Sequence, residues 1–372
     1  MPSGREVVVT CTKTGILLLA ACSPGQDAPR VEIATPFQAE SATCPDCRIE
    51  LESVVTLGSS DGPGALSRIP GSISIDGRGR FFVAPLGGEM PIVYSSAGEY
   101  LGSIGRPGEG PGQMVRPRSI FIGPADSVHV FDSNLGRISV FSPDLTYVRA
   151  YSMTWPQADM VMLPAGTLVI NGPIQTSDRI GFALHALNAD GDLSVSFEEY
   201  RVGARDAVWR RTLAVGPSGL WSIPYGHEHA LRLFDPESGD KLREILRESE
   251  WYPSIEQWRP ANPDHRPDPV IEGAWEDKGG IVWTAGWVHA PDWADHLKRA
   301  VNTGEGTMYA FDRNQGYDGV IEAVDSETGE LVASVRTNAP PWRVVEPGLI
   351  AFFREDSIGW WYADLYRVRL HR

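Results

Sequence analysis

The chain has 372 residues and a formal net charge of −15, and it contains 39 glycines and 29 prolines. A surface of this charge repels phosphate backbones and anionic lipid headgroups, which argues against nucleic acid as a partner. The glycine and proline content is typical of a chain with many tight turns, and the length is compatible with one large domain or two average ones.

The first segment of the chain carries an export pattern. Arg5 and Lys13 precede an apolar run at residues 15–21. The run is far too short to span a bilayer, which needs about 20 residues, but it is typical of a secretory signal. It ends in Leu19-Ala20-Ala21-Cys22, which resembles a bacterial lipobox. By that resemblance residues 1–21 are a signal peptide and Cys22 receives the lipid anchor. An ordinary signal peptide followed by a chance cysteine is the alternative.

Residues 22–47 are expected to form a tether between the anchor and a folded domain. As far as residue 43 they are rich in Pro, Ala, Ser, Gln and Glu and show no hydrophobic period, which is typical of disorder. A flexible coil of this length would span on the order of 25 Å. Cys44 and Cys47 then form a C-x-x-C motif, for which a local disulfide is the plainest outcome in an oxidising envelope. A metal or redox role and free thiols remain as alternatives.

Residues 48–372 are predicted to form one all-β domain made of repeats. Turn signals between short apolar strands recur at Ser96, Pro143, Ala189 and Pro236, spaced by 46 or 47 residues. A second series of turns gives an independent count of six, at residues 76–79, 123–126, 163–166, 216–219, 277–280 and 346–348. Six such repeats predict a six-bladed β-propeller.

The sixth repeat, which begins at Trp342, lacks an outermost strand. Residues 48–57 form a strand without a blade, because Ile49 and Leu51 alternate with Glu50 and Glu52. Pairing this N-terminal strand with the last repeat would close the ring and remove an exposed edge that could template aggregation.

The repeat at residues 105–151 shows its four strands most clearly, at 119–122, 127–131, 137–141 and 147–151, each bounded by turn residues. This repeat resembles an NHL repeat at Gly110-Pro111-Gly112-Gln113, Pro117, Val130-Phe131-Asp132 and Arg137-Ile138-Ser139-Val140-Phe141. The resemblance implies a six-bladed propeller of NHL type, of the kind common among bacterial lipoproteins.

The rhythm breaks in the fifth repeat, where Ser326 follows Pro236 by 90 residues. We expect the surplus to form a mainly helical and looped insert in blade five. Residues 251–269 are rich in Pro, Trp and Arg, and residues 292–301 have a helical pattern with Asp292 as a plausible N-cap. Function tends to lie on such excursions from a rigid scaffold.

Aromatic and imidazole side chains are concentrated in and beside this insert. Eleven of the twelve tryptophans follow residue 200. Tryptophans on loops have less reason to be buried than those on strands, and large amphipathic rings suit sugars, peptides or a protein partner. Burial between blades is the alternative. The candidates for a ligand-binding site are Trp251, Trp258, Trp287, His289, Trp293 and His296.

Two further groups could carry chemistry. His227 and His229 would lie on one face of a strand and could suit a metal, although no third ligand is identifiable and a place on the surface or between blades is the alternative. Several aspartates fall near strand ends, where they could line a central channel and hold a cation, or simply cap turns. They are Asp132, Asp159, Asp178, Asp277 and Asp356.

The sequence contains no nucleophile elbow, P-loop or dinucleotide-binding fingerprint. We therefore expect a non-catalytic propeller without a cofactor, lipid-anchored to a bacterial outer membrane and periplasmic or surface-exposed, that binds an envelope protein, a peptide or a glycan. The alternative is an enzyme. Six-bladed propellers that resemble this one include lactonases, strictosidine-synthase-like proteins and amidating lyases, and that resemblance implies calcium or zinc in the central channel.

Overall fold

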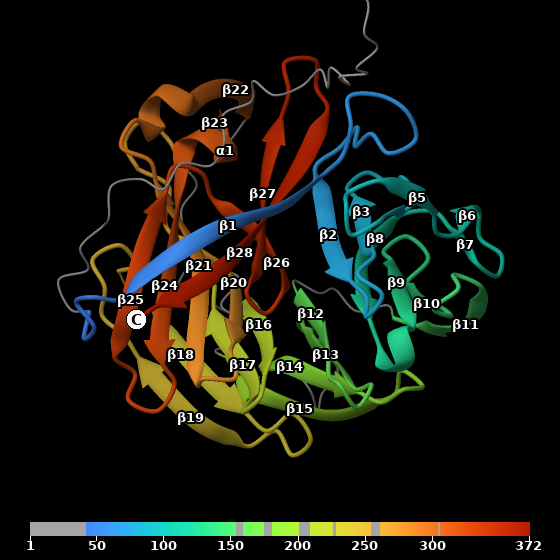
Figure 1. The fold of residues 1–372 in the computed structure, drawn as a ribbon, viewed down its shortest axis with the longest axis horizontal. Helices are drawn as coiled ribbons and strands as arrows, with labels where there is room; N and C mark the ends of the chain where they lie inside the picture. The colour runs from blue at the N-terminus through green and yellow to red at the C-terminus, as the bar shows by residue number, and fades with distance from the viewer. Residues whose placement is uncertain are drawn as a thin grey trace, which may run out of the picture. The chain divides into compact units, whose positions relative to one another are not determined.

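The computed structural model describes residues 42–153, 159–174, 181–200, 209–225, 228–253, 261–303 and 306–372. These residues form six four-stranded antiparallel sheets. Figure 1 shows the sheets arranged as blades around a common centre. The six-bladed all-β propeller predicted from the repeats is confirmed. No helix in the described ranges is long and apolar enough to cross a membrane.

Each of the first four blades consists of four consecutive strands, the first of which is innermost. Blade one contains β2 (Pro70–Ile75), β3 (Phe81–Pro85), β4 (Ile92–Tyr94) and β5 (Tyr100–Ser103). Blade two contains β8 (Pro117–Ile122), β9 (Val128–Asp132), β10 (Arg137–Phe141) and β11 (Tyr147–Ser152). Blade three contains β12 (Asp159–Met162), β13 (Leu168–Asn171), β14 (Phe182–Leu187) and β15 (Leu193–Glu199). Blade four contains β16 (Arg211–Gly216), β17 (Gly219–Pro224), β18 (Ala230–Phe234) and β19 (Lys241–Leu246).

The last two blades are built from segments that are not all consecutive. Blade five contains β20 (Val270–Glu276), β21 (Ile281–His289), β24 (Tyr317–Asp325) and β25 (Leu331–Thr337). Blade six contains β26 (Pro341–Glu346), β27 (Leu349–Glu355), β28 (Trp361–His371) and, as its outermost strand, β1 (Arg48–Leu57). Two short strands, β6 (Arg106–Pro107) and β7 (Gln113–Met114), pair in the connection between blades one and two, and the one-turn 3₁₀ helix η1 (Pro124–Asp126) joins β8 to β9.

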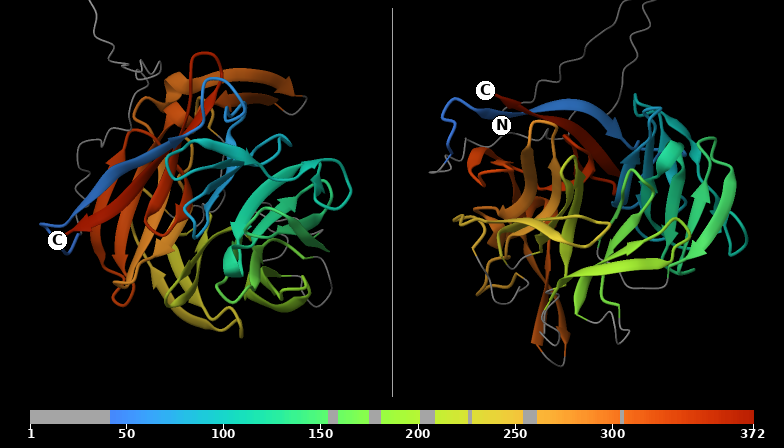
Figure 2. Two further views of the ribbon diagram at one scale, coloured as in Figure 1. Left: turned by 45° about the vertical axis from the view of Figure 1, so that its right-hand side comes forward. Right: turned by 90° about the horizontal axis from the view of Figure 1, so that it is seen from below.

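Strand β1 closes the ring as the sequence predicts. It pairs antiparallel with β28, from Arg48 opposite His371 to Leu57 opposite Ala363. Figure 2 shows the two strands side by side although they come from opposite ends of the domain. The outer turn of blade one approaches β1 so closely that a Cβ on Gly98, which has a φ of 81°, would lie 2.6 Å from the Thr56 carbonyl oxygen. Only glycine fits both the turn and this contact.

The insert of blade five differs from the expectation in its secondary structure. The helix predicted over residues 292–301 is a single 3₁₀ turn, η2 (Trp293–His296), whose N-cap Asp292 makes no side-chain capping bond. A hairpin of β22 (Leu297–Thr303) and β23 (Gly306–Phe311) follows, and then the one-turn helix α1 (Arg313–Gly316). The right-hand view of Figure 2 shows the orange hairpin standing away from the blades. Backbone pairing between the two arms of the insert outweighs the local helical pattern.

The apolar core is distributed between the blades. The described buried residues fall into six clusters, and each cluster joins neighbouring blades. The cluster between blades six and one, for example, includes Leu57 of β1, Phe81 of β3 and Leu349 of β27. Burial of both faces of each sheet fixes the blades against one another and leaves the edges of the innermost strands at the centre.

Candidate ligand-binding site at the mouth of the channel

The innermost strands β2, β8, β12, β16, β20 and β26 all begin at the same end of the propeller. Because successive strands of a blade are antiparallel, the second and fourth strands end there too. The connections between one blade and the next therefore also lie at this end. Both long excursions of blade five emerge at this end. One lies between β19 and β20, and the other between β21 and β24. We call this end the mouth.

A cavity of about 580 Å³ lies at the centre and is lined by residues of all six innermost strands. Cavities of about 300–1,000 Å³ are typical of small-molecule sites. The lining residues near the mouth are charged or polar, and they include Arg118, Asp159, Arg210, Tyr225, Glu272 and Arg343. Near the other end the lining is mostly apolar, with Ile75, Ile122, Met162, Val215 and Val345. The cavity therefore has a charged end at the mouth and a mostly apolar opposite end, where the lining also includes Glu346.

Asp159 opens β12 and binds backbone groups of its own blade and the next. Its Oδ1 accepts from the Met160 amide at 2.8 Å, and its Oδ2 accepts from the Leu213 amide of β16 at 2.9 Å. Loss of hydration raises the pKa of this carboxyl, against the lowering effect of those two bonds and of the positive charge of Arg343. Asp159 therefore takes up a proton more readily than a surface aspartate does.

Glu272 of β20 lies between a tyrosine and an arginine from the flanking blades. The Tyr225 hydroxyl donates to Glu272 Oε1 at 2.9 Å, and Arg343 Nη1 is 3.7 Å from Glu272 Oε2. The Arg210 guanidinium lies 3.8 Å from the centroid of the Tyr225 ring. Burial, and then the charge of Glu272, raises the pKa of Tyr225, so this hydroxyl stays protonated as a hydrogen-bond donor.

Side chains of the innermost strands also bond to the edge of the next blade. Arg343 Nε donates to the Gly71 carbonyl of β2 at 3.0 Å, Ser74 Oγ donates to the Ile120 carbonyl of β8 at 2.7 Å, and Thr212 Oγ1 donates to the Ile271 carbonyl of β20 at 2.5 Å. These bonds satisfy backbone groups that no neighbouring strand pairs with. They also hold the lining of the cavity rigid.

Of the four predicted aspartates that the structure describes, Asp159 is the one that lines the channel. Asp132 is buried and accepts from four backbone amides, and Asp277 and Asp356 likewise accept from the amides of their own turns. These three therefore cap turns, which was the alternative role. Asp178 lies outside the described residues.

Two tryptophans of the candidate set lie in the core. Trp251 is 7% exposed and donates from Nε1 to Glu322 at 3.0 Å, and Trp287 is 2% exposed and donates to the Pro341 carbonyl at 2.6 Å. The expectation that these side chains have little reason to be buried is wrong. Strand β21 runs on to His289, which makes Trp287 a strand residue, and Trp251 covers the interface between blades four and five. Trp258 lies outside the described residues.

The other three candidates are partly exposed at the mouth. Trp293 and His296 are half-buried in η2, and His296 Nε2 lies 3.5 Å from Asp292. His289 ends β21, and burial, followed by the charges of Arg266 and Arg336, lowers its pKa. The insert reaches the channel lining through α1, because Asn314 accepts from the Trp342 indole at 2.8 Å. Trp342 directly precedes Arg343.

His229 is buried between blades four and five. Its Nε2 is 3.7 Å from Glu322 Oε2, which also lies 3.1 Å from Arg247 Nη2. His227 lies outside the described residues. Within the described ranges, no group of three or more His, Cys, Asp or Glu side chains could hold a metal ion. Cys44 and Cys47 are joined by a disulfide, and Cys22 is not among the described residues.

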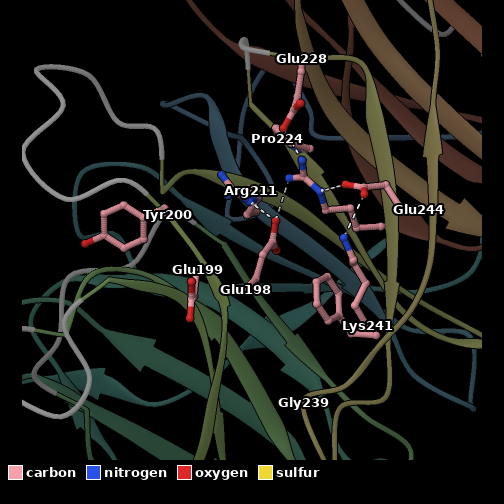
Figure 3. A pocket seen from close by; sticks show the side chains of 11 residues that line it. Glu198, Glu199, Tyr200, Arg211, Pro224, Glu228, Gly239, Lys241 and Glu244 are labelled. Carbon is pink, nitrogen blue, oxygen red and sulfur yellow. Dashed lines mark hydrogen bonds and ion pairs between the residues drawn. The ribbon is translucent and has the colours of Figure 1, made fainter.

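A second cavity, of about 570 Å³, lies between blades three and four (Figure 3). Its charged groups bond to one another. Arg232 binds Glu244 at 2.7 Å, Glu198 at 3.1 Å and also Glu228, while Arg211 binds Glu198 at 2.6 Å. A ligand would have to displace these ion pairs. The network is better explained as a connection between the two blades than as a binding site.

No protein-family model matches the sequence, and no curated protein is similar to it in sequence. Solved structures share the fold. A member of the DUF4221 family from Bacteroides vulgatus superposes with a TM-score of 0.60 at 11% identity, over 87% of this chain and 99% of the other. A protein from Bacteroides fragilis that is thought to be exported gives a TM-score of 0.55 at 9% identity, over 88% and 96%. Neighbours at this level of identity show the fold alone.

Proposed function

We propose that this protein is a non-catalytic binding protein of the bacterial cell envelope, and that its ligand enters the channel mouth. The observation that carries the proposal is the convergence of polar side chains from five blades on one cavity. Arg118 comes from blade two, Asp159 from blade three and Arg343 from blade six, with Tyr225 and Glu272 between them. A rigid, partly apolar cavity with a few oriented polar groups is the usual form of a ligand site.

The lining favours binding over metal-assisted catalysis. Its two carboxylates near the mouth, Asp159 and Glu272, are each committed to protein donors, and three arginines share the entrance with them. Positive charge at this density disfavours a bound cation. The donor set therefore does not fit calcium or zinc, and no step through a metal is derived.

The insert of blade five forms one wall of the proposed site. Trp293 and His296 are partly exposed on it, and His289 is partly exposed at the end of β21. Asn314 bonds the insert to Trp342 of β26, the strand that carries Arg343. A peptide, a protein loop or a glycan could contact this wall while one of its groups enters the channel. The NHL-type resemblance of blade two remains a prediction alongside this proposal.

Ligand screening tests the site. The purified full-length chain is screened against peptides and oligosaccharides by thermal shift, and each ligand that raises the unfolding temperature is titrated by calorimetry. Leu86 is 38% exposed and lines the cavity, so Leu86→Trp adds bulk at the entrance without disturbing the core. We expect this variant to bind at least about tenfold more weakly. Leu246→Trp, at a position 70% exposed on the outer strand of blade four, is the matched control. Equal binding by Leu86→Trp and the wild type would contradict the proposed location.

The proposed anchor rests on Leu19-Ala20-Ala21-Cys22. Cys22→Ser should leave the precursor uncleaved and without an acyl label, because the acylated thiol is the attachment point. Mass spectrometry of the mature wild-type protein checks this. An unmodified N-terminus at another residue would show that the chain is exported without a lipid.

A further inference from the structure

We infer that the ligand of the channel mouth is anionic and that its recognised group is the free carboxylate of a short peptide with an apolar side chain. This inference rests on the proposed function and specifies the class of ligand. It follows from the charge of the entrance lining, from arginine donors there that no described residue accepts, and from the apolar residues further along the cavity.

Among the charged residues that line the entrance of the cavity, positive charge exceeds negative charge, although the chain as a whole carries −15. Arg118, Arg210 and Arg343 line the entrance against Asp159 and Glu272. The positive region continues onto the rim. Arg68 and Arg116 are exposed on either side of the loop after β3, near Gly87 and Gly88, and neither forms an ion pair with any residue that the structure describes. Glu89 of the same loop accepts a bond from Ser67. A positive island on an acidic protein attracts and orients anions.

The arginines of the mouth retain hydrogen-bond donors that no residue in the described ranges accepts. Arg343 donates from Nε to Gly71 and from Nη1 to Trp342, whereas its Nη2 donates to no residue in the described ranges. Arg210 lies over the Tyr225 ring with Cζ 3.8 Å from the ring centroid, and a guanidinium in this position can still donate from its edge. Guanidinium edges of this kind bind carboxylates through paired hydrogen bonds.

The lining further from the mouth indicates that the part of the ligand beyond its carboxylate is apolar. Ile75, Ile122, Met162 and Val215 offer an apolar surface below the charged entrance. Sugars are usually bound on exposed aromatic faces. Trp251 and Trp287 are buried in the core, and the partly exposed Trp293 is not among the residues that line the cavity. A carboxylate joined to an apolar side chain fits this order of polar entrance and apolar interior. A neutral sugar would offer these arginines hydroxyl acceptors but no opposite charge.

Calorimetry with a matched pair of probes tests the inference. The probes are N-acetylated alanyl-leucine with a free carboxylate and the same peptide as its C-terminal amide. We expect the full-length chain to bind the acid at least about tenfold more tightly, and this advantage should shrink at high salt. Arg118→Gln should weaken binding of the acid several-fold and leave binding of the amide unchanged, because Arg118 is exposed and makes no ion pair with any described residue. Arg48→Gln, on the exposed outer strand β1, makes the same change in net charge and should have no effect.

The outcomes separate this inference from the proposed function. If the acid and the amide bind equally and Leu86→Trp weakens both, the mouth is a binding site but does not select an anion. If neither probe binds while a neutral ligand from the screen does, the ligand class is wrong and the site stands. If galacturonic acid binds more tightly than the peptide acid, the carboxylate belongs to a sugar and the peptide assignment is overturned.

Discussion

Single residues at the mouth divide into those that pack in the core and those that lie outside it. Trp287 packs against Trp342 with ring centroids 4.5 Å apart and belongs to the core between blades six and one. Trp293 is half-buried in η2 and belongs to none of the described core clusters. In the sequence the two tryptophans lie six residues apart, in and beside the insert of blade five. Their packing shows that Trp287 stabilises the core and that Trp293 does not belong to it.

This difference predicts unequal effects of two alanine substitutions. Trp287→Ala should lower the free energy of unfolding by about 3–5 kcal/mol, because it leaves a cavity in the core. It also removes the donor to the Pro341 carbonyl. Trp293→Ala should change the unfolding free energy by less than about 1 kcal/mol. Urea denaturation of both variants checks the prediction, and similar losses would mean that η2 is part of the core.

Among the elements, β1 closes the ring, because this N-terminal strand pairs with the last strand of the chain. It adds the fourth strand to blade six, and the last residue of β1, Leu57, is fully buried. Arg369 on β28 also pairs with Glu52 at 2.9 Å, which is a minor addition at an exposed position. Before β1, the Thr43 amide bonds to Leu331 of blade five, so the contact begins only just ahead of the strand.

Two truncations test the closure. Removing residues 1–43 should leave the unfolding temperature nearly unchanged, because β1 and its pairing with β28 remain. Removing residues 1–58 should lower the unfolding temperature and cause aggregation, because it exposes the edge of β28 and the cluster around Leu57. Scanning calorimetry and light scattering measure both effects. Equal stability of the two truncated chains would show that closure does not depend on β1.

At the scale of the whole molecule, the interfaces between blades carry buried polar groups as well as apolar ones. His229 of blade four faces Glu322 of blade five. Arg247 approaches the same carboxylate oxygen, and the rings of Trp251 and Tyr252 lie against the imidazole. Burial, and then the charge of Arg247, lowers the pKa of His229 from 6.5 to about 3. The imidazole is therefore neutral in the folded protein.

This lowered pKa predicts a loss of stability on acidification. The unfolded chain binds a proton at His229 near pH 6.5 and the folded chain only near pH 3, so the free energy of unfolding falls as the pH drops through that window. The slope from this one group reaches about 1.4 kcal/mol per pH unit. Burial raises the pKa of Glu322, and its protonation acts in the opposite direction. His229→Gln should make the pH dependence shallower between about pH 6 and about pH 4 in urea titrations. Parallel curves for the variant and the wild type would contradict this assignment.

The sequence by itself determined the blade count, the inner and outer turns and the closing strand. These features depend on local chemistry, namely period-2 alternation and turn residues, and residues 48–57 match β1 at both ends. The sequence also included Asp159 among the possible channel residues. It could not separate Asp159 from Asp132, since that depends on which side of a strand end faces the centre.

Only the tertiary structure decided which side chains form the candidate site. Arg118, Arg210 and Arg343 are scattered along the chain and follow no motif, and they meet because six innermost strands begin at one end of the ring. The burial of Trp287 was likewise decided by the length of β21 and by its packing against blade six. The hairpin in place of a helix after Leu297 depends on pairing between two arms of the insert. Contacts between segments distant in the sequence override local pattern, because packing and cross-strand bonds outweigh the small intrinsic preferences of single residues.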